Sequence, residues 1–475
     1  MKRILIPVLS LFFCQTVSAQ DFETATQAVA NMGLGWNLGN SLECNSGDIS
    51  NMWIEQWTSR KPSDYEKAWG QPVTKPELIA LFKDAGFGAI RVPVTWYPHM
   101  EATFSNFPWD PVSDPIGTQI QAAWMQRVHE VVDYVISQGM YCIINVHHDT
   151  GTSNTHWIVA DEDNYAQEHE RFEAVWKQIA NEFKDYDEHL LFEGYNEMLD
   201  SYNSWCFASF GTSSKYDADV AASAYSAVNK YAQSFVDAVR STGGNNAQRN
   251  LIVNTYCACA GEGTWNAHLQ DPLKEMTLPT DNVSDHLIFE VHDYPSIKSG
   301  INSAKSTIDQ LMKAVETHLA SKGAPVIFGE WGVPDDEKED DYTNRNADMR
   351  EFVRYFVEQA KARGFGTFYW MGLSDGDSRS VPEFSQADLV EALVKGYYGD
   401  DNPSAISMVE SGQRVSAPVK GDVNSNGKVD KDDLRDLVEY IMGNKPNGVT
   451  EESADVNGDN KVNVADVVAL TPLLT

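Results

Sequence analysis

This chain has few cysteines, few positive charges and, after its first 20 residues, no long apolar stretch. Six cysteines among 475 residues are too sparse for a disulfide framework, and Cys257 and Cys259 lack the spacing of a zinc site. No later segment offers the ~20 apolar residues that span a membrane. Because 36 basic residues face 69 acidic ones, nucleic acid and anionic membranes are disfavoured as partners. With 42% hydrophobic residues, the chain can still bury a large core.

The first 19 residues have the pattern of a secretory signal peptide. Two basic residues precede an apolar stretch over residues 4–14, and Val17 and Ala19 occupy the positions that a signal peptidase reads. The stretch is too short for a membrane anchor, and the bulky residue before Cys14 argues against a lipid-modified cysteine. We expect an exported protein that is extracellular or attached to a cell surface, with the periplasm as the alternative.

Short apolar or β-branched segments recur along the chain and alternate with helical patterns. Helical periodicity is clear over residues 124–139, 171–186, 223–243 and 350–364. Strands that are apolar on both faces and alternate with helices predict a parallel (β/α)8 barrel. The fifth connection, residues 258–285, should be a long loop with a short helix. The eight expected strands are 33–40, 89–96, 141–148, 190–197, 250–257, 286–294, 326–332 and 366–371.

A doubly wound open sheet would also alternate strands and helices, but it would gather its polar groups mainly at one switch point. Here polar or aromatic residues end nearly every strand, as is typical of a barrel enzyme. No glycine-rich phosphate loop opens any helix. The residues at the strand ends are Asn37, Trp96, His147, His148, Asn196, Glu197, His292, Tyr294, Glu330 and Trp370.

Two of these strand ends carry a glutamate where the loop begins, Glu197 and Glu330. A single glutamate at such a place is usually only solvated. A pair facing each other across a barrel mouth, one protonated and one ionised, is what cleavage of a glycosidic bond requires. A separation of about 5 to 5.5 Å would predict a covalent intermediate and retention, and a wider gap would predict inversion.

The segments GWNLGNSLE, AIRVPVTW, IINVHH, FEGYNEM, EVHDYP, FGEWG and FYWMG together resemble glycoside hydrolase family 5, most closely its endoglucanase branch. The resemblance covers most of residues 25–400 and implies a retaining (β/α)8 hydrolase. It assigns Glu197 as the acid/base and Glu330 as the nucleophile. The remaining active-site positions that it implies are Arg91, His147, Asn196, His292, Tyr294 and Trp370, and we add Asn37 and His148 as expected substrate contacts.

Chemical roles consistent with this resemblance can be given to the residues around the two acids. We expect Arg91 to hold Glu330 ionised through a charge-assisted fork, with a second hydrogen bond from Tyr294. His292 should bond Glu197 and modulate its pKa as it changes from acid to base.

The sugar itself should contact a further group of residues. Asn196 can hydrogen-bond the 2-hydroxyl of the sugar, and Trp370 offers a flat apolar face for a pyranose ring. The two histidines should line the floor of the site. Because side chains alternate along a strand, we expect His147 and His148 to point apart, which disfavours a shared metal site. Thirteen tryptophans indicate stacking platforms along an extended cleft and favour an enzyme that acts within a polymer.

The fourth strand carries another acid, Glu193, on the same face as Glu197. At ~3.3 Å per residue it would lie roughly 13 Å deeper in the barrel. We therefore expect Glu193 to be structural and paired with a cation or a hydroxyl, with Glu290 as a neighbour.

After Pro403 the barrel pattern stops, and two twelve-residue segments, 422–433 and 455–466, align without gaps at a period of 33. Their oxygen-bearing residues have the spacing of a loop that wraps Ca²⁺, with each lysine contributing its backbone carbonyl. Solvated turns are a poor alternative because both copies are in register. The predicted ligands are Asp422, Asn424, Asn426, Lys428 and Asp433, followed by Asp455, Asn457, Asp459, Lys461 and Asp466.

With no helix before the first loop, this tail resembles a dockerin, a calcium-folded module that binds a cohesin on a scaffold or cell surface. Each loop ends with Asp instead of the usual Glu, and Asn460 replaces a usual glycine. Positions that often contact the cohesin are Lys431-Asp432 and Val464-Ala465 instead of Ser/Thr pairs, and they differ between the repeats.

The sequence thus predicts a secreted retaining endo-β-1,4-glucanase that hydrolyses cellulose or related β-glucans, with a monomeric catalytic domain, no cofactor for catalysis and Ca²⁺ in the tail. Xyloglucan, mixed-linkage glucan or mannan are the alternative substrates. A non-catalytic carbohydrate-binding or assembly protein is the rival from another class. The predicted boundaries are residues 1–19 for the signal peptide, 20–408 for the catalytic domain, 409–420 for the linker and 421–475 for the dockerin-like module.

Overall fold

The protein is described here from a computed structural model. The predicted signal peptide and linker lie outside the residues that it describes. Those residues are 22–47, 52–100, 117–152, 156–212, 215–333 and 342–402, and in the tail 421, 423–424, 429, 431–444, 446, 449–457 and 461–474.

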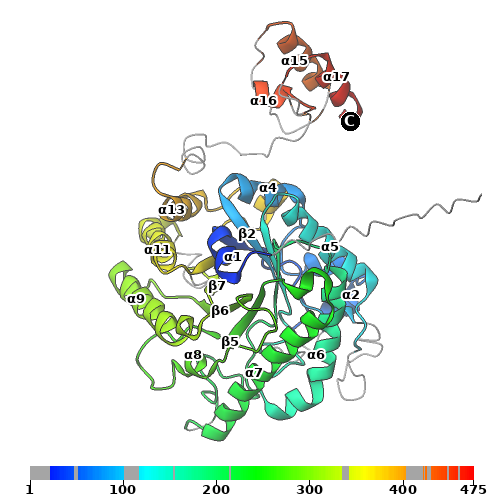
Figure 1. The fold of residues 1–475 in the computed structure, drawn as a ribbon. Coiled ribbons are helices and arrows are strands. Elements are labelled where there is room, and N and C mark those ends of the chain that lie inside the picture. The colour runs from blue at the N-terminus through cyan, green and yellow to red at the C-terminus, as the bar shows by residue number, and fades with distance from the viewer. Residues whose placement is uncertain are drawn as a thin grey trace, which may run out of the picture.

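The predicted (β/α)8 barrel is confirmed. Eight parallel strands pair in sequence order, and β1 also pairs with β8, which closes the barrel and excludes an open sheet. Figure 1 shows the helices arranged around the outside of the strands. The strands are β1 (Leu34–Asn37), β2 (Phe87–Val92), β3 (Tyr141–Asn145), β4 (Leu190–Glu193), β5 (Leu251–Cys259), β6 (Leu287–Asp293), β7 (Val326–Trp331) and β8 (Gly366–Tyr369).

Several strands end earlier than the sequence suggested, and this changes the geometry of the site. β3 ends at Asn145 and β4 at Glu193, so His147, His148 and the pair Asn196-Glu197 stand on the loops that follow. The depth of roughly 13 Å predicted for Glu193 assumed extended strand geometry through Glu197, whereas the strand ends at Glu193 itself.

The four helices that the sequence marked most clearly are confirmed, as is the short helix in the fifth connection, α8. Aspartates begin two of the long helices: the side chains of Asp161 and Asp217 accept backbone N–H groups in the first turns of α6 and α7. The α-helices are α1 (Ala25–Asn31), α2 (Trp53–Trp57), α3 (Pro62–Glu66), α4 (Pro76–Asp84), α5 (Ala122–Ile136), α6 (Glu162–Glu182), α7 (Ala218–Ser241), α8 (Asp271–Glu275), α9 (Ile301–His318), α11 (Tyr342–Ala362), α12 (Asp377–Ser380), α13 (Ala387–Tyr398), α15 (Lys431–Ile441), α16 (Glu451–Ala454) and α17 (Val464–Leu470). Short 3₁₀ helices are η1 (Tyr97–His99), η2 (Gly244–Ala247), η3 (Ala320–Lys322) and η4 (Thr471–Leu473).

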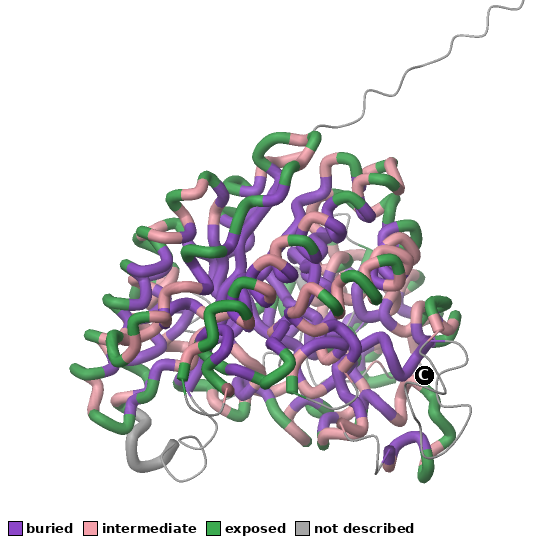
Figure 2. Tube along the Cα trace, turned by 90° about the horizontal axis from the view of Figure 1, so that it is seen from below, coloured by how far each residue is buried: buried purple, intermediate pink, exposed green. Residues whose placement is uncertain are grey.

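The interior of the barrel has an apolar layer and, two residues further along the strands, a polar one. Seven strands contribute to the apolar layer, which α1 covers with Ala25, Ala28 and Val29. A larger core fills the space between strands and helices, and Figure 2 shows the buried chain concentrated in the middle of the molecule. The apolar layer is Ala89, Ile143, Leu191, Ile252, Ile288, Ile327 and Phe368.

The tail forms its own small core, separate from the barrel's. Val423 and Leu437 from the first repeat pack with Val456 and Leu470, their equivalents in the second. Each repeat thus contributes the same two apolar positions, as a tandem duplication predicts. Within the described residues, no helix is long and apolar enough to cross a membrane.

Candidate active site

The polar layer of the barrel is the base of the site. Because side chains alternate, the residue two positions beyond each apolar-layer residue points to the same interior. Five of these positions are charged or carboxamide residues that are fully buried. They are Arg91 on β2, Asn145 on β3, Glu193 on β4 and Glu290 on β6, and Asn254 on β5 completes the ring.

Arg91 lies at the centre of this layer, and its fork engages Glu193. Nε and an Nη of Arg91 donate to the two oxygens of Glu193 at 2.6 and 2.8 Å. Only one further nitrogen reaches Glu330, at 2.7 Å. The predicted fork between Arg91 and Glu330 is therefore wrong. Glu193 is fully buried and has to be satisfied by hydrogen-bond donors, and it takes two of the N–H groups of Arg91. The prediction of a cationic partner for Glu193 is confirmed.

Glu330 stands beside His292 because of an irregularity in β7. The register of β6 and β7 shifts between Val291 and His292, so that His292 pairs with Glu330 and Gly329 becomes the extra residue. Tyr294 donates its hydroxyl to Glu330 Oε2 at 3.0 Å, as expected. With Arg91 on the other oxygen, this glutamate has a donor on each side.

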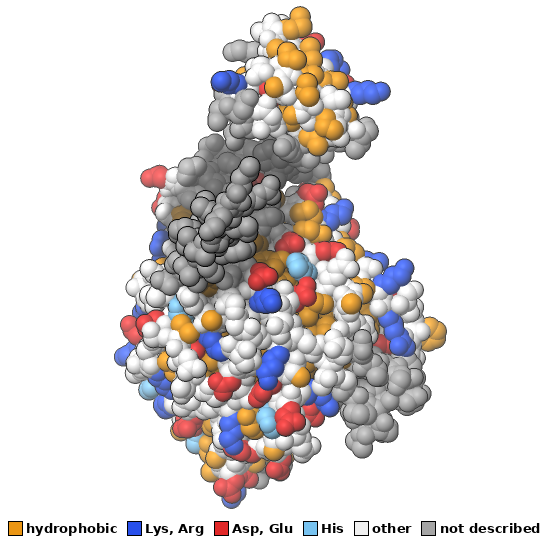
Figure 3. All heavy atoms as spheres, turned by 45° about the vertical axis from the view of Figure 1, so that its right-hand side comes forward, with side chains coloured by type: hydrophobic (Ala, Val, Ile, Leu, Met, Phe, Trp, Pro, Cys, Tyr) orange, Lys and Arg blue, Asp and Glu red, His pale blue; other side chains and the backbone are white. Residues whose placement is uncertain are grey.

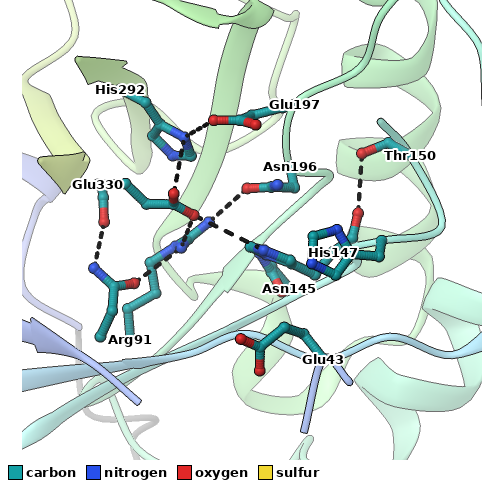
Figure 4. Close-up of polar contacts among 12 residues, drawn as sticks. Glu43, Arg91, Asn145, His147, Thr150, Asn196, Glu197, His292 and Glu330 are labelled. Atoms are coloured by element: carbon teal, nitrogen blue, oxygen red, sulfur yellow. Dashed lines mark hydrogen bonds and ion pairs between the residues drawn. The ribbon is translucent and has the colours of Figure 1, made fainter. Parts of the chain in front are cut away.

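Glu197 and Glu330 both face Nδ1 of His292. His292 Nδ1 is 2.8 Å from Glu197 Oε1, which confirms the predicted contact. The Glu197 side chain keeps 20% of its exposure and thus faces the open end of the barrel. One oxygen of each glutamate and the imidazole nitrogen all lie within 4.8 Å of one another. Figure 4 shows both carboxylates turned toward the imidazole.

The surroundings drive the two acids toward opposite protonation states. Burial raises the pKa of Glu197, against the lowering effect of its hydrogen bond with His292. Burial would also raise the pKa of Glu330, but the charges of His292 and Arg91 lower it below its ordinary value. Between these two pKa values, Glu197 holds a proton and Glu330 is a carboxylate.

The predicted sugar contacts are brought together at the barrel mouth, although not all reach the cleft. Asn37 is fully buried: it donates to backbone carbonyls, including that of Gly329 at 2.8 Å, and accepts from Arg91 at 2.9 Å. Asn196 accepts from Arg91 at 3.0 Å. Asn37 thus shapes the base of the site and leaves no polar atom directed at a sugar.

Trp370 and the two histidines lie together in the site. The rings of His147 and Trp370 lie parallel, 6.1 Å apart, and Trp370 is partly exposed. The prediction that His147 and His148 point apart was wrong, because their rings are 4.4 Å from each other. The alternation of a strand does not apply to residues beyond Asn145, where β3 ends.

A cavity of about 330 Å³ opens on the Glu197 side of the site. Its lining includes Glu197, His292, the acidic pair Glu262 and Asp293, and three free cysteines, but not Glu330. Two further tryptophans in the lining, Trp205 and Trp265, are 43% and 60% exposed. The sequence did not mark this cavity, because its residues come from loops after different strands. The expectation of no disulfide framework holds for all five cysteines among the described residues.

Sequence reasoning also missed two carboxamides of the polar layer. Asn145 Nδ2 lies 3.0 Å from both His147 Nδ1 and Glu193 Oε1. Asn254 donates to the same oxygen of Glu193 at 3.3 Å. The available signal was the alternation of side chains along a strand, which puts Asn145 on the face of Ile143 and Asn254 on the face of Ile252.

The sequence profile described as Cellulase (glycosyl hydrolase family 5) matches residues 50–375. This chain belongs to glycosyl hydrolase family 5. Residues 420–474 match the Dockerin type I domain. The chain is accordingly a glycoside hydrolase of the endoglucanase type with a dockerin at its C-terminal side.

Relatives agree on the fold and on the class of enzyme. Endoglucanase B of Neocallimastix patriciarum is 31% identical over 400 residues, which cover 78% of this family 5 chain and 72% of the relative. A broad-specificity endoglucanase from an uncultured bacterium is 53% identical, with a TM-score of 0.74, and covers 81% of this chain and 98% of its own. A family 5 enzyme from Prevotella bryantii B14, solved with a xyloglucan tetradecasaccharide, is 38% identical, with a TM-score of 0.67 and 80% and 100% coverage.

The dockerin loops of this family 5 protein close in the same way in both repeats. Asp433 accepts the backbone N–H of Asn424 at 3.2 Å, and Asp466 accepts that of Asn457 at 3.1 Å. Both aspartates are fully buried. Among the predicted ligands, Asp422, Asn426, Lys428 and Asp459 lie outside the described residues. Two buried carboxylates in a donor set made of oxygen atoms fit a hard cation such as Ca²⁺.

Proposed function

We propose that the protein is a secreted, retaining endo-β-1,4-glucanase with Glu197 as acid/base and Glu330 as nucleophile. The observation that carries this is the approach of the two carboxylates, whose nearest oxygens lie within 4.8 Å. Retaining enzymes need this closeness, because inversion requires room for a water molecule between the acids and the sugar. The opposite shifts of the two pKa values support the assignment of roles.

The reaction proceeds by double displacement. Glu330, ionised and held by Arg91 and Tyr294, attacks the anomeric carbon while Glu197 gives its proton to the leaving oxygen. The bond from carbon to the leaving oxygen breaks, and a glycosyl ester forms on Glu330. Glu197, now a carboxylate, then takes a proton from water as the water oxygen attacks the same carbon and releases Glu330. Asn196 contacts the 2-hydroxyl, and Trp370 and His147 form the wall beside the sugar.

The polymer continues on the Glu197 side of the site. The leaving group of the reaction lies next to the acid that protonates it, and the cavity lined by Glu197 is on that side. Its two exposed tryptophans, Trp205 and Trp265, can stack on pyranose rings, and its acidic pair can accept hydroxyl hydrogen bonds. A cleft that continues past the acid favours cleavage within a chain over removal of terminal sugars.

Cellulose and related β-glucans are the proposed substrates. The names of the structural relatives include broad-specificity endoglucanases and a xyloglucan complex, so xyloglucan is the strongest alternative, followed by mixed-linkage glucan and mannan. Release of reducing ends from carboxymethylcellulose, barley β-glucan, xyloglucan and mannan separates these choices. Hydrolysis of mannan alone would contradict the proposal.

The tail is proposed to tether the enzyme to a cohesin or a cell-surface scaffold, with the domain boundaries given above. Its α15, the turn that follows and α17 expose Val438, Met442, Val464 and Val468, and Figure 3 shows hydrophobic side chains gathered on the tail domain at the top. An apolar face of this kind on a small domain suits a protein partner. It also fits the dockerin match.

Calcium removal should unfold the tail and spare the barrel. Asp433 and Asp466 are buried carboxylates, so without a cation their loops lose the charge that balances them. In EGTA, residues 421–475 should be digested by protease much faster than in Ca²⁺, while hydrolysis of a soluble β-glucan stays unchanged. The D433A/D466A double variant should be digested rapidly in Ca²⁺ as well. Equal protease resistance with and without the chelator would contradict the calcium assignment.

A further inference from the structure

Glu290 is a buried acid that no step of the proposed reaction uses. It is fully buried in the polar layer and does not line the cleft. Its Oε1 lies 3.1 Å from His292 Nε2 and 3.3 Å from Arg91 Nε. Its other oxygen, Oε2, has no hydrogen-bond partner among the described residues. A carboxyl group in this position is costly to bury, so a role that repays the cost is to be expected.

The chain before the nucleophile is built around this carboxyl group. A Cβ atom on Gly329 would lie 1.5 Å from Glu290 Oε1, so any side chain there would displace this carboxyl group. Glycine directly before Glu330, at the extra residue of the register shift that pairs His292 with Glu330, thus leaves room for the Glu290 carboxyl in its observed position. The same irregularity positions the nucleophile and makes room for Glu290.

Glu290 and Glu197 occupy opposite nitrogens of one imidazole. Glu197 Oε1 is 2.8 Å from Nδ1, and Glu290 Oε1 is 3.1 Å from Nε2. In neutral His292, a proton on Nε2 donates to Glu290 and leaves Nδ1 as an acceptor for the protonated Glu197. In cationic His292, both nitrogens donate, and Nδ1–H stabilises Glu197 as a carboxylate. Because Nε2 carries a proton in both states, only an acceptor that stays at Nε2 suits both of them without rotation of the ring.

We propose that Glu290 is a positioning residue that holds His292 on Nε2, so that Nδ1 serves Glu197 both as acid and as base. This inference rests on the proposed function of Glu197. The charged groups facing Glu290 are Arg91 from β2, Glu193 from β4, His292 on its own strand and Glu330 from β7. Arg91 and protonated His292 are two cations among three carboxyl groups, so the local charge is sensitive to the protonation state of Glu290.

E290Q tests this through the pH dependence of kcat/KM, because glutamine keeps the shape and the acceptor oxygen but removes the charge. Burial and the neighbouring Glu193 raise the pKa of Glu290 to about 7, so it is anionic on the alkaline side. A negative charge on Glu290 raises the proton affinity of the His292–Glu197 pair. Loss of this negative charge should move the alkaline limb of the kcat/KM profile to lower pH by about 1 unit. The kcat on cellopentaose should fall about 10-fold, which is part of the ~10² to 10⁴-fold rate enhancement that acid–base catalysis supplies.

E193Q is the matched control, since Glu193 shares Arg91 with Glu290 but has no hydrogen bond with His292. We expect E193Q to lower the melting temperature and to move the alkaline limb less than E290Q does. G329A should displace the Glu290 carboxyl and reproduce the E290Q shift. An unmoved limb in E290Q, or an equal shift in E193Q, would overturn the proposal.

Two readouts separate this inference from general damage and from failure of the proposed function. With a dinitrophenyl cellobioside, whose leaving group needs no proton, formation of the glycosyl ester should be nearly unaffected in E290Q, whereas a structural defect would slow both substrates. The ¹⁵N shifts of the His292 ring should report a proton on Nε2 in the wild type and a mixture of tautomers in E290L. Identical shifts in E290L would refute the role of Glu290 without recourse to activity, and an inactive wild type would refute the proposed function instead.

Discussion

E330Q is expected to lower kcat on cellopentaose by on the order of 10⁴-fold or more, while the fold stays intact. Glutamine occupies the same volume, and its oxygen can still accept from Arg91 while its NH2 group donates to the Tyr294 oxygen, but it is no nucleophile. The loss should therefore appear in the rate and not in the circular dichroism spectrum. E197Q should lose about 10² to 10⁴ in kcat, with a smaller loss on a substrate whose leaving group needs no proton.

External azide distinguishes the two acids further. In E197A, azide should attack the glycosyl ester on Glu330 and give a β-glycosyl azide, since no base is needed for an anion. In E330G, azide should take the place of the nucleophile and give the α-product from an activated β-glycoside. E330Q with wild-type activity would contradict the mechanism and would favour the non-catalytic carbohydrate-binding alternative.

R91M should reduce the free energy of unfolding by about 3 to 5 kcal/mol, the range found when one partner of a buried ion pair is removed. Arg91 is fully buried and lies within 3.3 Å of Glu193, Glu290 and Glu330. Without it, these carboxyl groups must take up protons or remain uncompensated. Urea denaturation of the catalytic domain measures the change.

R354M is the matched control for that stability prediction. Arg354 also pairs with two carboxylates, Glu358 and Asp400, but on the surface, with 40% of its side chain exposed. Its loss should cost less than about 1 kcal/mol. The R91M/E193Q double variant should regain part of the lost stability but not the activity. An R91M protein as stable as the wild type would show that the buried carboxyl groups do not depend on Arg91.

The fold could be predicted from the sequence because its signals are local and repeated. Each strand is apolar on both faces, each long helix has its own periodicity, and the order of elements leaves a barrel or an open sheet. The residues at the strand ends then favoured the barrel, and closure of β1 on β8 confirmed it. The duplicated loops of the tail were recognisable for the same reason.

That Glu197 and Glu330 meet in one site could be predicted from the sequence, but the contacts that hold them there could not. Alternation along a strand predicts which residues share a face only as far as the strand extends, and β4 ends at Glu193. The positions of Asn196 and Glu197 depend instead on loop geometry. Several buried carboxylates compete for Arg91, and its two-pronged hydrogen bond goes to Glu193. This outcome depends on distances between strands, which no sequence pattern contains.

The central claim, that Glu197 and Glu330 lie close enough for a covalent intermediate, is tested most directly by the stereochemistry of the first product. Hydrolysis of a reduced cellooligosaccharide can be followed by ¹H NMR from the first seconds, before mutarotation mixes the anomers. Retention predicts that the β-anomer appears first and the α-anomer only later. Initial release of the α-anomer would mean inversion and would contradict it.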